Sequence, residues 1–90
     1  MNFKTFYLEK VRPYALKVAN NTRELRKFIY QYVNMIDNAL SEGNPRKACM
    51  TAMNWNEEIN DLPIFNYFHC QWQSLDKLKE LVNELIEMPF

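Results

Sequence analysis

Cys49, His69 and Cys70 are the side chains of this sequence best suited to hold a soft metal ion. A structural zinc site normally takes four ligands, and these three are the whole supply of Cys and His. His69 and Cys70 are also neighbours, so on a helix they point in directions about 100° apart. We therefore expect no metal site and no cofactor, and we expect the thiols to act as small apolar groups near the edges of their helices.

Catalysis needs a nucleophile with a base and an orienting group within hydrogen-bond reach. The sequence has no glycine-rich loop that could cradle a phosphate, and no pattern pairs a Ser or Cys with His69. Its later carboxylates fall at solvent-facing positions of the predicted helices, where they need no catalytic explanation. They are Glu57, Glu58, Asp61, Glu80 and Glu84. We expect no catalytic residues and no enzyme.

One candidate binding surface surrounds Tyr30, the only aromatic residue on the polar face of the central predicted helix. Arg23, Arg26, Lys27 and Asn34 lie within one or two turns of it. An aromatic ring among cations and an amide suits a nucleic-acid backbone or an acidic protein surface. An isolated tyrosine on a solvated helix is the commoner explanation of the same pattern.

Met50 and Met53 form a second candidate binding surface. They project away from the apolar stripe of their own helix, beside Arg46 and Glu57. Flexible methionines outside a core favour partner binding. Burial against the last helix is an equally good explanation of their position.

The central element of the chain is a helix predicted over residues 22–42. Asn21 is expected to cap its first turn, with Glu24 three residues later as the second half of a capping box. Gly43 supplies the left-handed residue that ends it. Apolar residues recur between these signals at steps of three and four, which predicts one broad buried face. They are Leu25, Phe28, Ile29, Tyr32, Val33, Met35, Ile36, Ala39 and Leu40.

Three further helices are predicted around the central one. The first covers residues 2–20 and is interrupted at Pro13, because a proline removes one backbone hydrogen bond and clashes with the preceding turn. Asn44-Pro45 marks the start of another, over residues 45–60, whose apolar positions are Ala48, Ala52, Trp55, Ile59 and Leu62. The last is predicted over residues 64–88, and its apolar positions are Phe65, Phe68, Trp72, Leu75, Leu78, Val82, Leu85 and Ile86.

The fold class follows from these elements and from the composition. Hydrophobic residues make up 48% of the 90 residues, which is enough for a core, and a single glycine disfavours a many-stranded β fold. We expect one all-α domain over residues 1–90, an antiparallel bundle of three to four helices with short connections. No export signal or membrane-spanning run is apparent, and only two cysteines are present. These features favour a cytoplasmic protein that does not contact a membrane.

The net charge is zero, but the two halves differ in sign. Residues 1–47 contain nine basic and four acidic side chains, or 9 − 4 = +5, and residues 48–90 contain two basic and seven acidic, or 2 − 7 = −5. Such an asymmetry can mark a nucleic-acid-binding arm. In an antiparallel bundle the simpler expectation is that the basic early helices lie beside the acidic late ones and balance them.

The helix pair around Gly43 resembles two known patterns. Tyr32, Gly43 and Ala48 stand at the signature spacing of a tetratricopeptide unit, although Ala52, Trp55 and Pro63 depart from it. The resemblance covers about a third of the chain and implies a helical hairpin, not the family's peptide-binding function.

Ala39 and Gly43, followed by Cys49 and Ala52, also resemble a DNA-binding helix-turn-helix. Asn38, Glu42 and Asn44 stand where that motif needs apolar residues. The helix-turn-helix interpretation is therefore only a minor alternative.

The leading hypothesis is a non-enzymatic interaction protein that binds another macromolecule as a regulator, adaptor or inhibitor. The chain has many large apolar residues for its length, and Phe3, Phe6 and Phe90 are hard to bury in one small bundle. A protein partner is favoured, and self-association into a homo-oligomer fits the same surplus. Similar short, Asn-rich sequences are frequent among phage and mobile-element accessory proteins, an analogy from composition alone. The alternative is a nucleic-acid-binding protein that uses the basic N-terminal half, namely Lys10, Arg12, Lys17, Arg23, Arg26, Lys27 and Tyr30.

Overall fold

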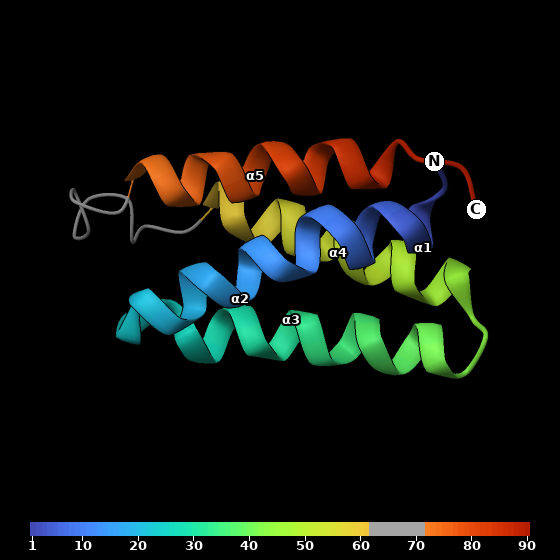
Figure 1. The fold of residues 1–90 in the computed structure, drawn as a ribbon, viewed down its shortest axis with the longest axis horizontal. Coiled ribbons are helices and arrows are strands. Elements are labelled where there is room, and N and C mark those ends of the chain that lie inside the picture. Colours follow the sequence, from blue (N-terminus) through green and yellow to red (C-terminus); the bar gives the residue numbers. More distant parts are fainter. Residues whose placement is uncertain (62–71) are drawn as a thin grey trace.

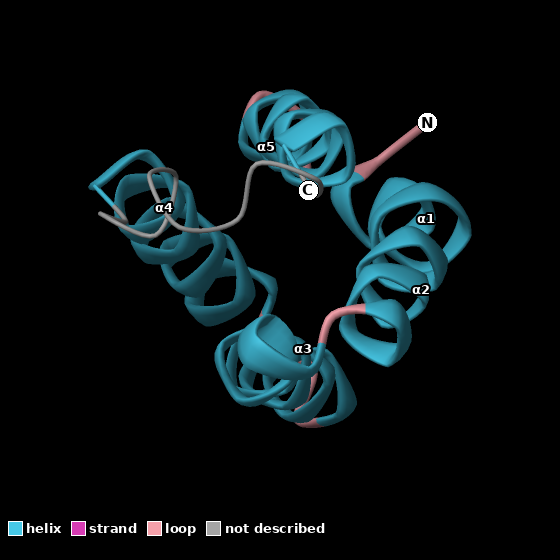
Figure 2. Ribbon diagram, turned by 90° about the vertical axis from the view of Figure 1, so that its left-hand side faces the viewer, coloured by secondary structure: helices cyan, strands magenta, loops and turns pink. Residues whose placement is uncertain are grey.

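The computed structural model describes residues 1–61 and 72–90, and in these the chain forms helices that lie side by side (Figure 1). The elements are α1 (Phe3–Phe6), the π-helical segment η1 (Tyr7–Val11), α2 (Arg12–Asn21), α3 (Arg23–Ser41), α4 (Pro45–Asp61) and α5 (Trp72–Ile86). Because α1, η1 and α2 follow one another without a gap, they form one continuous helix. Viewed along the bundle, this helix, α3, α4 and α5 occupy four corners (Figure 2). No strand occurs in the described residues, and the predicted all-α antiparallel bundle is confirmed.

The irregularity predicted at Pro13 lies one turn before it. The backbone N–H of Arg12 donates to the carbonyl of Tyr7, five residues back, which is the hydrogen bond of a π-helix. Pro13 then stands in the first turn of α2, where a missing N–H is tolerated. The extra residue in the π-turn lets the helix pass the proline without a break.

The junction between α2 and α3 differs from the prediction. Asn21 was expected to cap α3 in a capping box with Glu24, but it is the last residue of α2, and Thr22 occupies the N-cap position. The extended Thr22 backbone makes the break, and its side chain accepts no capping hydrogen bond. Two side chains of α3, Arg26 and Tyr30, form hydrogen bonds with Ala19 and Asn20 near the end of α2.

The turn between α3 and α4 agrees with its sequence signals. Gly43 adopts a left-handed backbone with φ of 72°. The N–H groups of Gly43 and Asn44 donate to the carbonyls of Leu40 and Ala39, at 3.1 and 2.9 Å, which is the hydrogen-bond pattern of a Schellman motif. Asn44 also caps α4, since its Oδ1 accepts from the N–H of Lys47 at 3.1 Å. One residue thus ends the first helix and starts the second, which makes the hairpin tight.

The core fills the space between the helices. The rings of Tyr32 and Trp55 are stacked, with centroids 5.6 Å apart, so α3 and α4 stay in contact well beyond their turn. The predicted core positions of α4 that the structure describes are buried. In α5, the predicted core positions from Leu75 to Leu85 are buried and Ile86 is partly buried. The buried residues of these two helices are Ala48, Ala52, Trp55, Ile59, Leu75, Leu78, Val82 and Leu85. The predicted core residues Leu62, Phe65 and Phe68 lie outside the described residues.

Three expectations about burial are corrected. Phe3 and Phe6 are buried, because the N-terminal turn lies against the C-terminal segment, where the Phe3 N–H donates to the Pro89 carbonyl at 2.7 Å. Met35, expected on the apolar face of α3, is exposed. It is turned about 100° from the fully buried Ile36, beyond the reach of the neighbouring helices.

The C-terminal helix ends at Ile86 rather than at the predicted Met88. The N–H groups of Glu87 and Met88 donate to carbonyls three residues back, at 3.2 and 3.0 Å, so the chain tightens as the helix ends. The predicted start at residue 64 lies outside the described residues. Within the described part of the chain, we find no helix whose length and apolar character would let it cross a membrane.

Candidate interaction surfaces

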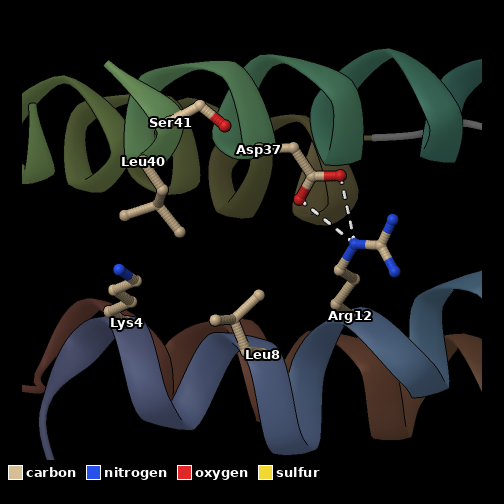
Figure 3. A pocket seen from close by; sticks show the side chains of 6 residues that line it. All are labelled: Lys4, Leu8, Arg12, Asp37, Leu40 and Ser41. Atoms are coloured by element: carbon tan, nitrogen blue, oxygen red, sulfur yellow. Dashed lines mark hydrogen bonds and ion pairs between the residues drawn. The ribbon is translucent and has the colours of Figure 1, made fainter. Parts of the chain in front are cut away.

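A hollow of about 340 Å³ lies between the N-terminal helix and α3 (Figure 3). Lys4, Leu8 and Arg12 border it on one side, and Asp37, Leu40 and Ser41 border it on the other. Arg12 Nε donates to both oxygens of Asp37, at 3.0 and 3.2 Å. The charged groups at this end of the hollow are therefore already bonded to each other.

The same carboxylate accepts a hydrogen bond from the buried Tyr7. The Tyr7 hydroxyl lies 2.8 Å from Asp37 Oδ1 and 3.2 Å from the Val33 carbonyl. Burial, followed by the hydrogen bond to Asp37, raises the pKa of Tyr7 well above its usual value. Since Tyr7 is protonated and Asp37 is bonded on both sides, this cluster joins helices and offers no free base or nucleophile.

Two of the predicted binding residues on α3 turn toward the end of α2. Arg26 Nε donates to the Ala19 carbonyl at 3.3 Å, and its Nη2 lies 3.5 Å from the Asn20 carbonyl. The Tyr30 hydroxyl donates to Asn20 Oδ1 at 3.0 Å. A cation at a helix C-terminus satisfies orphan carbonyls and opposes the negative end of the dipole. Arg26 and Tyr30 therefore have a structural role in the bundle.

The other predicted residues on α3 remain on the surface. Arg23, Lys27 and Asn34 are exposed. Tyr30, the centre of this candidate surface, is half-buried and hydrogen-bonded, so its ring is less available for stacking than the sequence suggests. These five residues lie together on α3. None of them lines any of the three hollows found in the described part of the chain.

Met50 and Met53 lie on the outer face of α4. They are 60% and 49% exposed, so the burial alternative does not hold for either. Arg46 and Glu57, one turn before and one turn after them, are exposed as well. We call these four residues the α4 stripe. Met50 and Arg46 also border a hollow of about 380 Å³ on the surface of α4.

A groove of about 320 Å³, lined by three lysines and by Glu9, runs between the N-terminal helix (η1 and α2) and α5. Lys10, Lys17 and Lys77 line it with Tyr14. Lys77 Nζ lies 4.8 Å from the centroid of the Tyr14 ring, and the Tyr14 hydroxyl donates to the Ser74 carbonyl at 3.1 Å. The ring thus connects the two helices and places one cation over its face.

The expected charge balance between the halves is not seen among the described side chains. The two ion pairs there, Arg12–Asp37 and Lys47–Glu42, both lie within the basic N-terminal half. No group of three or more potential metal ligands occurs in the part of the chain that the structure describes. Cys49 is half-buried and burial raises its pKa, which suits an apolar role, while His69 and Cys70 lie outside the described residues.

No family model, no curated protein and no solved structure matches this chain. The functional argument therefore depends on the surfaces themselves. Sequence reasoning missed the Tyr7–Asp37–Arg12 cluster, whose members are 25 and 30 residues apart along the chain. It also missed the hydrogen bonds of Arg26 and Tyr30 to the end of α2.

Proposed function

We propose that this protein is a non-enzymatic helical module that acts by binding another protein, as a cytoplasmic regulator, adaptor or inhibitor. The observation that carries the proposal is the exposure of two neighbouring methionines, Met50 and Met53, on the outer face of α4. Large flexible apolar side chains in contact with water gain free energy when a partner covers them. The compositional likeness to phage and mobile-element accessory proteins supports the same class of function.

The packing of α4 against the bundle favours this proposal, because it holds the α4 stripe in place. On the opposite side of α4, Ala48, Ala52 and Trp55 are fully buried, and Trp55 stacks on Tyr32. The helix is capped at its start by Asn44. A rigid helix that presents a row of side chains loses little conformational entropy when it binds, which makes a small surface more effective.

Affinity capture tests the proposal. The wild-type protein, the double variant Met50→Lys/Met53→Lys and the control Met35→Lys would be immobilised and exposed to an extract of the native host. Met35 is a suitable control because it is exposed to a similar degree, but on α3. We expect a protein that the wild type and the control retain and that the double variant loses by about tenfold or more. Equal capture by all three proteins would contradict the proposal.

Nucleic-acid binding is a second candidate because Lys10, Lys17 and Lys77 line one groove beside Tyr14. Affinity for a polyanion through these lysines would fall steeply with salt and would weaken on Lys17→Glu. The internal bonds of Arg12 and Arg26 make those two residues poor tests of binding, since their replacement also disturbs the bundle. Titration of single- and double-stranded DNA and RNA at two salt concentrations tests this alternative, and salt-independent binding or none would remove it.

A further inference from the structure

The α4 stripe has a spacing that reads the same in both directions. Its four residues stand at steps of four, three and four: Arg46, Met50, Met53 and Glu57. This is the spacing of the contact seam of a coiled coil, and all four side chains are exposed. With a rise of 1.5 Å per residue, the stripe is about 16 Å long.

Reversing the stripe exchanges its members in pairs. If a second α4 lies antiparallel across the first, with the two-fold axis midway between Met50 and Met53, each Met50 meets the Met53 of the other copy. Each Arg46 then meets the other copy's Glu57. A two-fold interface needs a surface that is complementary to itself in this way, with every contact made twice.

The charges select this arrangement over the parallel one. In a parallel pair, Arg46 would face Arg46 and Glu57 would face Glu57, so both ends would repel. In the antiparallel pair both ends carry opposite charges. Neither Arg46 nor Glu57 takes part in the ion pairs of the described side chains, where Lys47 pairs with Glu42 instead.

Among the residues that the structure describes, no helix covers this face of α4. Figure 2 shows α4 at a corner, diagonally across from the continuous helix of α1 and α2. Its inward stripe is buried, while the α4 stripe lies on the outward side. The flat row of two methionines offers apolar area at the centre, and the charged residues stand at the rim, as in an ordinary protein interface.

We infer that the α4 stripe binds a second copy of this chain, in an antiparallel, two-fold symmetric helix pair. The inference deepens the proposed function, on which it depends, by naming the first partner of that surface. The contact is short, so the dimer is a weak one that forms and separates with concentration.

Charge exchange between two variants tests this geometry. In the Arg46→Glu variant, position 46 and Glu57 of the other copy are both acidic, so both ends of the dimer repel. In the Glu57→Arg variant both ends are basic and repel equally. An equimolar mixture of the two variants forms a mixed dimer in which both ends again pair opposite charges.

Sedimentation velocity from about 10 µM to 1 mM covers the range expected for an interface of this size. For the wild type we expect the average mass to rise with concentration from 10.9 kDa toward twice that value. Each variant alone should associate about tenfold more weakly, and the mixture should recover association to within about threefold of the wild type. Lys27→Glu, an equal change of charge on the exposed face of α3, should leave association unchanged.

Two results would overturn the inference. One is a wild type that remains monomeric at 1 mM, and the other is a dimer that both variants weaken without recovery in the mixture. Affinity capture distinguishes these results from a failure of the proposed function. A monomer that still captures a protein through Met50 and Met53 removes only self-association, whereas a dimer that captures nothing removes only the foreign partner.

Discussion

The Tyr7 hydroxyl donates to the Asp37 carboxylate at 2.8 Å, joining the π-helical segment to α3 across 30 residues of sequence. Tyr7 is fully buried, so this bond satisfies a polar atom that would otherwise be stranded in the core. Arg12 holds the other side of the carboxylate from the next turn of the same helix. Together these contacts fix how the N-terminal helix is rotated against α3.

Tyr7→Phe is expected to lower the free energy of unfolding by about 1–2 kcal/mol, because it removes a buried, charge-assisted hydrogen bond. Arg12→Ala should cost less, under about 1 kcal/mol, since its side chain is 40% exposed and the ion pair is screened by solvent. Urea unfolding of both variants measures the difference. An Arg12→Ala variant less stable than Tyr7→Phe would show that the ion pair, and not the buried hydroxyl, dominates.

High pH should destabilise the fold through Tyr32. Burial, followed by the neighbouring Glu58 carboxylate, raises the pKa of Tyr32 to about 12 from the ordinary value of 10.0. A group with a raised folded-state pKa contributes its full stability below pH 10 and loses it as the pH rises toward 12. The wild type should therefore lose about 1 kcal/mol more than Tyr32→Phe between pH 9 and pH 11.

Urea unfolding of the wild type and Tyr32→Phe at these two pH values provides the measurement. Tyr7, whose pKa is raised for similar reasons, remains in both proteins and contributes equally to their alkaline loss. Parallel pH curves for the two proteins would contradict the assignment to Tyr32.

Gly43→Ala should destabilise the protein by about 1–2 kcal/mol through backbone strain alone. The residue has φ of 72°, which disfavours a side chain, but an added Cβ would meet nothing within 4 Å. Gly43→Asn should cost less, because Asn tolerates the left-handed region. Thermal unfolding of the two variants compares them, and equal losses would mean that the backbone conformation is not the cause.

Arg26→Ala separates the structural role of this residue from a binding role. Because Arg26 holds the last carbonyls of α2, its loss should lower stability by about 0.5–1 kcal/mol. Lys27→Ala, one residue further on and exposed, should be nearly neutral. Chemical denaturation of both variants measures the difference. An Arg26→Ala variant as stable as the wild type would show that Arg26 has no structural role at the end of α2.

The features predicted correctly from the sequence are those that depend on local chemistry. Gly43, Asn44 and Pro45 each carry a strong preference for one position of a helical turn, and the structure places them there. The period of the apolar residues likewise predicted the buried faces of α3 and α4. The end of α2 was less predictable, because Arg26 and Tyr30 form hydrogen bonds with its last turn from the next helix, and such contacts leave no local signal in α2 itself.

Contacts between polar residues far apart in the chain could not be predicted from the sequence. Asp37 falls on the polar side of its helix, and nothing in its own segment indicates that Tyr7 and Arg12 converge on it. The sequence alone could not decide whether Met50 and Met53 are exposed or buried, because the answer depends on where α5 packs. The symmetric spacing of the α4 stripe is visible in the sequence. It indicates a contact between two copies only because the structure shows that its side chains are exposed.

Methyl NMR of the wild-type protein tests most directly whether the α4 stripe is the binding surface. The chain has five methionines, which act as natural reporters on different faces when their methyl groups are labelled with carbon-13. On increasing the protein concentration or adding a captured partner, the Met50 and Met53 signals should shift or broaden, while Met1, Met35 and Met88 stay constant. Changes at Met35 with none at Met50 and Met53, or no change at any methionine, would contradict this account.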